Sequence, residues 1–198
     1  MKNANHPKKG SRIAVDPIRK MKDIKAIMKL LSNNPRDLLL FTIGINNGLR
    51  TIDLLNLKVK DIRHLKNGDT IKIKESKTGK TNILAINKTV HKALLNYLES
   101  ENLNDDDYLF KSRKGNQALQ SQAVSKLVKK WTSDINLKGN YGAHTLRKTF
   151  GYIQRKVFGV GFEIICKRYN HSSPAITMRY LGIEDKEVNG ILLNNEIG

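Results

Sequence analysis

The hydrophobic pattern of this 198-residue chain changes its period twice. Across residues 69–86, apolar and polar side chains alternate, and a glycine-containing stretch at 76–80 interrupts the alternation. The segments before and after carry apolar residues at helical spacing. Alternation puts successive side chains on opposite faces of a strand, whereas a period of 3.6 makes a stripe along a helix. The pattern therefore predicts an α+β chain, mostly α-helical, with one small antiparallel β-hairpin.

Start and stop signals divide the helical parts. Asp16 before Pro17 predicts the start of the first helix, and Asn34 before Pro35 predicts the start of the second, which Gly48 ends. Residues 61–65 are a candidate third strand. The remaining predicted helices cover residues 49–57, 88–98, 123–131, 143–157, 161–168, 174–181 and an amphipathic stretch in 184–197.

The charge balance indicates the class of partner. Lysine and arginine total 36 against 18 acidic residues, a net charge of +18. A globular chain this basic most often binds a polyanion, with nucleic acid ahead of ribosomal RNA or an anionic membrane surface. No apolar run approaches the roughly 18 residues of a membrane helix. The single cysteine, Cys166, suits a reducing interior, so we expect a cytoplasmic protein.

Three segments follow from composition and periodicity. Residues 1–15 read as a basic N-terminal arm, residues 16–183 as one domain, and residues 184–198 as a C-terminal helical tail. The apolar residues of the tail can pack on a neighbouring subunit or fold back on their own core.

Residues 141–180 gather side chains that can bind and attack a phosphate. His144 and Arg147 lie three apart in a predicted helix, so both leave one face. His171 follows in an Asn-His-Ser-Ser turn, and Tyr180 lies nine residues beyond it. Each residue alone is ordinary in a basic protein. By proximity, three other tyrosines are rival nucleophiles: Tyr141, Tyr152 and Tyr169.

Two other chemistries fit poorly. Gly79-Lys80-Thr81 looks like the end of a nucleotide-binding loop, but that motif needs a glycine where Lys74 stands and a helix after the loop. The five histidines are not spaced as zinc ligands. An acidic run at 105–107 is more typical of a solvated loop than of a metal site. We therefore expect no metal and no cofactor.

Taken together, five pieces of the chain resemble a known catalytic signature. In order they are Gly-Leu-Arg ending at Arg50, Lys77-Thr78-Gly79-Lys80, the pair His144 and Arg147, then His171 and Tyr180. This order and spacing are similar to those of the tyrosine recombinase (phage integrase) family, from about residue 16 to about 190. The resemblance implies that family's catalytic-domain fold, a double-stranded DNA substrate and a homotetramer on DNA.

The resemblance also implies a catalytic site of six residues: Arg50, Lys77, His144, Arg147, His171 and Tyr180. Family members cleave a DNA strand through a 3′-phosphotyrosyl intermediate, without metal or ATP. The implied nucleophile is Tyr180, and the implied proton donor to the departing 5′ oxygen is Lys77, with Lys80 as the alternative.

The physical chemistry of the reaction agrees with these roles. Negative charge builds on the phosphate oxygens, and the planar guanidinium groups of Arg50 and Arg147 suit it. His144 can accept or relay the phenolic proton, and His171 can donate a hydrogen bond to the phosphate. Asp53, three residues after Arg50, can orient its guanidinium, and the alternative is a surface ion pair that contributes little.

Two other functions stay open from the sequence. A type IB topoisomerase-like enzyme shares this chemistry and relaxes supercoils, and a non-catalytic DNA-binding module would share only the fold. Recombinases of the family usually carry an N-terminal helical domain that clamps the DNA, and here about fifteen residues precede the first predicted helix.

Overall fold

The computed structural model describes residues 15–112, 115–182, 190 and 193–194, and the arm and tail expected at the two ends lie almost wholly outside this part. The described elements, in chain order, are α1 (Met21–Leu30), α2 (Pro35–Asn47), α3 (Thr51–Leu55), α4 (Val59–Ile62), β1 (Thr70–Lys74), β2 (Thr81–Ala85), α5 (Lys88–Ser100), α6 (Ser121–Asp134), α7 (Ala143–Lys156), α8 (Phe162–Tyr169) and α9 (Pro174–Leu181). None of the helices in these ranges is long and apolar enough to cross a membrane.

The predicted hairpin is confirmed, but the third strand was wrong. Strands β1 and β2 pair antiparallel, with Thr70 opposite Ala85 and Lys74 opposite Thr81. In the described chain this sheet has two strands. The start of the candidate strand instead belongs to α4, because the Asp61 carboxylate accepts the backbone N–H of Lys58 at 2.7 Å and closes a helical turn there.

The first helix begins later than predicted. Asp16 does not cap α1, because its carboxylate accepts bonds from the Asn140 N–H at 3.0 Å and from the Arg19 guanidinium at 3.1 Å. The chain from Asp16 to Ile18 lies along α7 instead. There the Thr145 hydroxyl donates to the Asp16 carbonyl and the Ile18 N–H donates to the Thr149 hydroxyl, both at 2.9 Å. Tertiary bonds thus replace the local cap.

The second helix begins and ends as its signals predicted. The Asn34 side chain accepts the Asp37 N–H at 3.3 Å, and Pro35 is the first helical residue. Gly48 ends α2 with φ of 59°, the left-handed region that favours glycine. This turn delivers the chain directly to Arg50 and α3.

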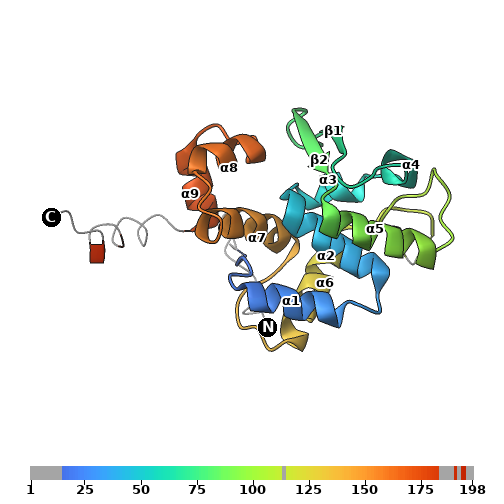
Figure 1. Ribbon diagram of the computed structural model, residues 1–198, viewed down its shortest axis with the longest axis horizontal. Coiled ribbons are helices and arrows are strands. Elements are labelled where there is room, and N and C mark those ends of the chain that lie inside the picture. Colours follow the sequence, from blue (N-terminus) through green and yellow to red (C-terminus); the bar gives the residue numbers. More distant parts are fainter. Residues whose placement is uncertain (1–14, 113–114, 183–189, 191–192, 195–198) are drawn as a thin grey trace, which may run out of the picture.

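Helix α7 connects the two parts of the molecule. It packs against α2, α3 and α6 on one side and against α8 and α9 on the other (Figure 1). The main core lies on the first side. A smaller cluster, formed by Ile165, Tyr169 and Leu181 with Phe150 and Tyr180 packed against it, joins α8 and α9 to α7. Both helices that follow α7 therefore depend on this small cluster for their position.

A glycine on α7 permits that contact. A Cβ atom at Gly151 would lie 2.3 Å from the Tyr169 hydroxyl oxygen and 2.9 Å from a Leu181 methyl. Alanine normally stabilises a helix interior by about 1 kcal/mol relative to glycine. We expect Gly151→Ala to do the reverse and to lower the free energy of unfolding by about 1–3 kcal/mol through overpacking. Urea denaturation followed by circular dichroism measures this difference, and a more stable variant would contradict the close packing.

Candidate active site

Arg147 is a buried guanidinium at the centre of the predicted site. It is 3% exposed, and its two terminal nitrogens donate to the Gly48 carbonyl at 2.7 Å and the Tyr169 carbonyl at 2.9 Å. Its guanidinium carbon also lies 4.1 Å from the centroid of the Tyr169 ring. Helix α7 supplies the arginine, while the ends of α2 and α8 fix the direction of its fork.

Arg50 reaches the same region from the turn that precedes α3. Its guanidinium forms an ion pair with the Glu75 carboxylate, with 2.5 Å between nitrogen and oxygen. The expectation that Asp53 orients Arg50 was wrong. Asp53 is buried and accepts the backbone N–H of Ser76 at 2.8 Å, so it fixes the hairpin turn instead.

Lys77 lies in that turn, between β1 and β2, and its side chain is exposed. The turn is held from both sides, by Asp53 at Ser76 and by a hydrogen bond of 2.5 Å from the Thr78 hydroxyl to Glu75. The Lys77 ammonium is close enough to His144 to contribute to the shift of its pKa. The positive charge of Lys77 therefore acts on the first turn of α7.

His144 lies on the first turn of α7, at the surface of the site. Its pKa is lowered, first by partial removal from water and then by the positive charges of Arg147, Lys77 and Arg50. The imidazole is therefore neutral near pH 7. A neutral imidazole can accept a proton.

His171 follows Asn170, which ends α8 in the left-handed conformation with φ of 54°. Its Nδ1 lies 3.0 Å from the Thr177 hydroxyl of α9. Burial, together with the charges of Arg147 and Arg50, lowers the pKa of His171 to about 4. When the Thr177 hydroxyl donates to Nδ1, the neutral ring keeps its proton on Nε2 and can donate it to a ligand.

Tyr180 on α9 lies among these groups. Its ring packs edge-on against Tyr169 and His171, with centroids 5.6 Å and 5.5 Å away, and the Lys148 ammonium lies 5.1 Å from its centroid. Its hydroxyl is buried and makes no hydrogen bond with any described residue. Burial raises the pKa of Tyr180, while the positive charges of Arg147 and Arg50 oppose that rise.

The rival tyrosines have other partners. Tyr169 is fully buried, and its hydroxyl donates to the Arg147 carbonyl. The Tyr141 hydroxyl donates to the Lys138 carbonyl at 3.0 Å. Tyr152 lies under the Arg19 guanidinium, which is 5.7 Å from its ring centroid. Of the four tyrosines, Tyr180 is the one whose hydroxyl is buried without a partner beside the arginine pair.

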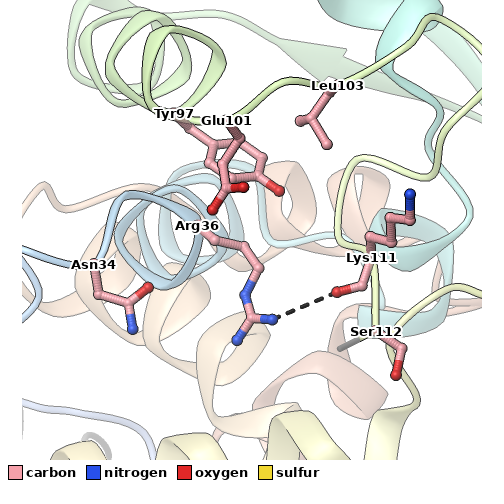
Figure 2. A pocket seen from close by; sticks show the side chains of 7 residues that line it. All are labelled: Asn34, Arg36, Tyr97, Glu101, Leu103, Lys111 and Ser112. Atoms are coloured by element: carbon pink, nitrogen blue, oxygen red, sulfur yellow. Dashed lines mark hydrogen bonds between the residues drawn. The ribbon is translucent and has the colours of Figure 1, made fainter. Parts of the chain in front are cut away.

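A pocket outside this site is lined by an arginine that makes contacts within the protein. It has a volume of about 220 Å³ and lies where the start of α2 meets the loops after α5 (Figure 2). The Arg36 guanidinium in it donates to the Lys111 carbonyl at 3.4 Å and pairs with the buried Asp37 carboxylate at 2.8 Å. None of the six predicted site residues lines this pocket.

A family model described as the phage integrase family matches residues 19–187. The chain belongs to the phage integrase family. A relative from Bacillus subtilis, named probable integrase/recombinase YoeC, is 36% identical over 174 residues, which cover 86% of this chain and 91% of that protein. A protein of Pseudothermotoga lettingae named tyrosine recombinase is 29% identical over 166 residues, 83% of this chain and 56% of its own length.

Solved structures of the same fold agree with this placement. The crystal structure of XerA recombinase superposes with a TM-score of 0.73 at 21% identity, over 92% of this chain and 67% of that one. The XerH recombinase bound to palindromic difH substrate superposes with a TM-score of 0.71 at 22% identity, over 92% of this chain and 54% of that one. This phage integrase family chain thus spans little more than half the length of several proteins that it matches. The predicted tyrosine recombinase catalytic-domain fold is confirmed.

Sequence reasoning missed Glu75, which pairs with Arg50 inside the site. The alternating pattern places Glu75 only at the end of a strand. Ile71, Ile73 and Glu75 share one face of that strand, so a carboxylate falls on the half-buried apolar side, two residues before Lys77. A charge on a buried face needs a partner, and that was the available signal.

Proposed function

We propose that this chain is a site-specific DNA recombinase that cuts and rejoins strands through a 3′-phosphotyrosyl bond at Tyr180. One observation carries the proposal. The buried, unpartnered Tyr180 hydroxyl is subject to the positive charges of Arg147 and Arg50, and its ring packs against His171. The lowered pKa values of His144 and His171 keep both imidazoles neutral near pH 7.

In the proposed cleavage step, the phenolic oxygen of Tyr180 attacks phosphorus while its proton passes to His144. The bond from phosphorus to the 5′ oxygen breaks, and Lys77 gives that oxygen a proton. The products are a 3′-phosphotyrosyl bond and a free 5′-hydroxyl. A 5′-hydroxyl from another strand reverses the step, so the bond energy is conserved and no ATP is consumed.

Charge stabilisation comes from fixed cations in this proposal. Arg50 and Arg147 receive the charge that develops on the non-bridging oxygens, and their geometry is already set before DNA binds. His171 donates from Nε2 to the same phosphate. The protein's own residues therefore supply the roles that the transesterification needs.

The wider setting is proposed from the family. Residues 16–183 form the catalytic domain, and double-stranded DNA bearing a specific site is the substrate. A homotetramer assembles on that DNA in the cytoplasm, with residues 184–198 reaching a neighbouring subunit. One neighbour of the same fold is a lambda integrase dimer bound to a core site, with a TM-score of 0.62 at 16% identity.

Trapping the covalent adduct tests the function. The purified chain is incubated with a pool of nicked duplexes whose nick lets the short cleaved end diffuse away, so that religation fails. We expect an adduct that survives denaturing electrophoresis, and mass spectrometry should place the nucleotide on the peptide that contains Tyr180. Sequencing the attached strand then gives the site.

Two results would contradict the proposal. Relaxation of a supercoiled plasmid that lacks the recovered site would indicate a topoisomerase-like activity. DNA binding without an adduct from any pool would indicate a non-catalytic binding module.

A further inference from the structure

Glu75 is a buried carboxylate at the end of β1, two residues before Lys77. The residue is 1% exposed, and its side chain is 0% exposed. Removing a charged carboxylate from water is costly unless other groups replace the hydration. The structure shows which groups do so.

Both carboxylate oxygens of Glu75 contact polar or charged groups from separate parts of the chain. Oε2 accepts a hydrogen bond from the Thr78 hydroxyl and forms an ion pair with the Arg50 guanidinium, each at 2.5 Å. Oε1 receives the side-chain amides of Asn82 at 2.7 Å and Asn170 at 3.1 Å. These contacts lower the pKa of Glu75 to about 2, against the opposing effect of burial, so it stays charged at any physiological pH.

The partners of Glu75 belong to the predicted site or lie next to its residues. Arg50 is one of them, Thr78 follows Lys77, and Asn170 precedes His171. The separation of 95 residues between Glu75 and Asn170 means that the contact exists only in the folded chain. A single carboxylate therefore joins the arginine, the hairpin turn and the turn between α8 and α9.

A second set of bonds fixes the same junction. The Arg168 guanidinium donates to the Asn82 side chain and the Ile83 carbonyl, each at 2.7 Å, and to the Asn47 carbonyl at the end of α2. Asn82 in turn donates to Glu75. The hairpin is thus tied to α2 and α8 around the carboxylate, so a change at Glu75 is transmitted to both.

We propose that Glu75 is a positioning residue that sets the mutual placement of Arg50, the Lys77 turn and the His171 turn. It touches none of the reacting atoms and acts through the groups that do. The proposal rests on the proposed function for its effect on DNA cleavage, but the placement itself can be measured without DNA.

Glu75→Gln is the sharpest change. Glutamine keeps the shape but replaces one acceptor oxygen with an NH₂ donor. In Glu75, Oε1 accepts two hydrogen bonds, and Oε2 accepts one and pairs with the Arg50 guanidinium. In either orientation of the glutamine amide, its NH₂ group would therefore face a donor or a cation, and the charge that pairs with Arg50 is lost. Glu75→Asp keeps the charge on a shorter side chain and serves as the conservative variant.

Asp37→Asn is the matched control. Asp37 is also a buried carboxylate, 3% exposed, and it pairs with Arg36, which lines the pocket in Figure 2 away from the site. Neutralising it removes a comparable buried pair without touching the hairpin. A general loss of stability should therefore appear in both variants, and a loss of placement only in Glu75→Gln.

Two measurements test the proposal. In single-turnover cleavage of the trapped-adduct substrate, we expect Glu75→Gln to be slower by about 10- to 100-fold, because small displacements of reacting groups have effects of this size. DNA affinity should change far less. Glu75→Asp should cleave faster than Glu75→Gln, and Asp37→Asn should cleave at the wild-type rate. In free protein, amide hydrogen exchange of residues 76–80 and 169–173 should quicken roughly tenfold in Glu75→Gln only.

The outcomes separate the two proposals. Cleavage by Glu75→Gln within twofold of wild type, or unchanged exchange in the His171 turn, would overturn the positioning role. If Glu75→Gln does not fold, the same comparison is made with Glu75→Asp. If the wild-type chain cleaves no DNA, the proposed function fails, and the exchange data alone decide whether Glu75 places the two turns.

Discussion

Tyr180→Phe is expected to abolish the covalent DNA adduct without weakening the fold. The phenolic oxygen is the only non-hydrogen atom removed, and it is the proposed nucleophile. In the described structure this hydroxyl is buried and makes no hydrogen bond. An unsatisfied buried polar group costs about 1–3 kcal/mol, so its removal should leave the free energy of unfolding unchanged or raise it. Denaturing electrophoresis of the trapped substrate and urea denaturation measure the two quantities on the same preparation.

Tyr169→Phe gives the opposite pattern and serves as the control. Its hydroxyl donates to the Arg147 carbonyl from a fully buried ring. Losing that bond should lower the free energy of unfolding by about 1 kcal/mol, while the adduct still forms at Tyr180. An adduct that persists in Tyr180→Phe would place the nucleophile on another residue, and the peptide that carries the nucleotide would identify it.

Arg147→Ala is the second large effect. Its fork is already oriented by the carbonyls of Gly48 and Tyr169, and removing one such pre-organised donor slows a reaction by on the order of 10²–10³. We expect at least that loss in the single-turnover cleavage rate. DNA binding should persist, because affinity comes from many phosphate contacts of a chain with 36 lysines and arginines. Fluorescence anisotropy and the cleavage rate are measured on the same duplex.

Arg147→Lys and Arg36→Ala complete this experiment. Lysine restores the charge but has no planar fork, so it should recover only part of the rate. Arg36 is a partly buried arginine with a carboxylate partner outside the site, and its loss should leave the cleavage rate unchanged. Near-normal cleavage by Arg147→Ala would show that Arg147 is not needed for the reaction.

The sequence by itself determined most of the local structure. The change of period around residues 69–86 predicted the hairpin, and Asn34, Pro35 and Gly48 marked both ends of α2. These signals work because hydrophobic period, caps and glycine conformations act within a few residues of the chain. The same locality explains the error at Asp16, which had a cap-like sequence but was used for contacts to Asn140 and Arg19.

The sequence also identified the family signature, since that depends on order and spacing. What only the tertiary structure decided is which buried charges meet. Asp53 was expected at Arg50 and instead holds Ser76, while Glu75 takes Arg50 and also receives Asn170 from 95 residues away. A buried carboxylate must find donors, but the sequence does not say which distant segments will supply them. That choice is made by the folded arrangement, in which hydrogen bonds join the hairpin to α2, α3 and α8.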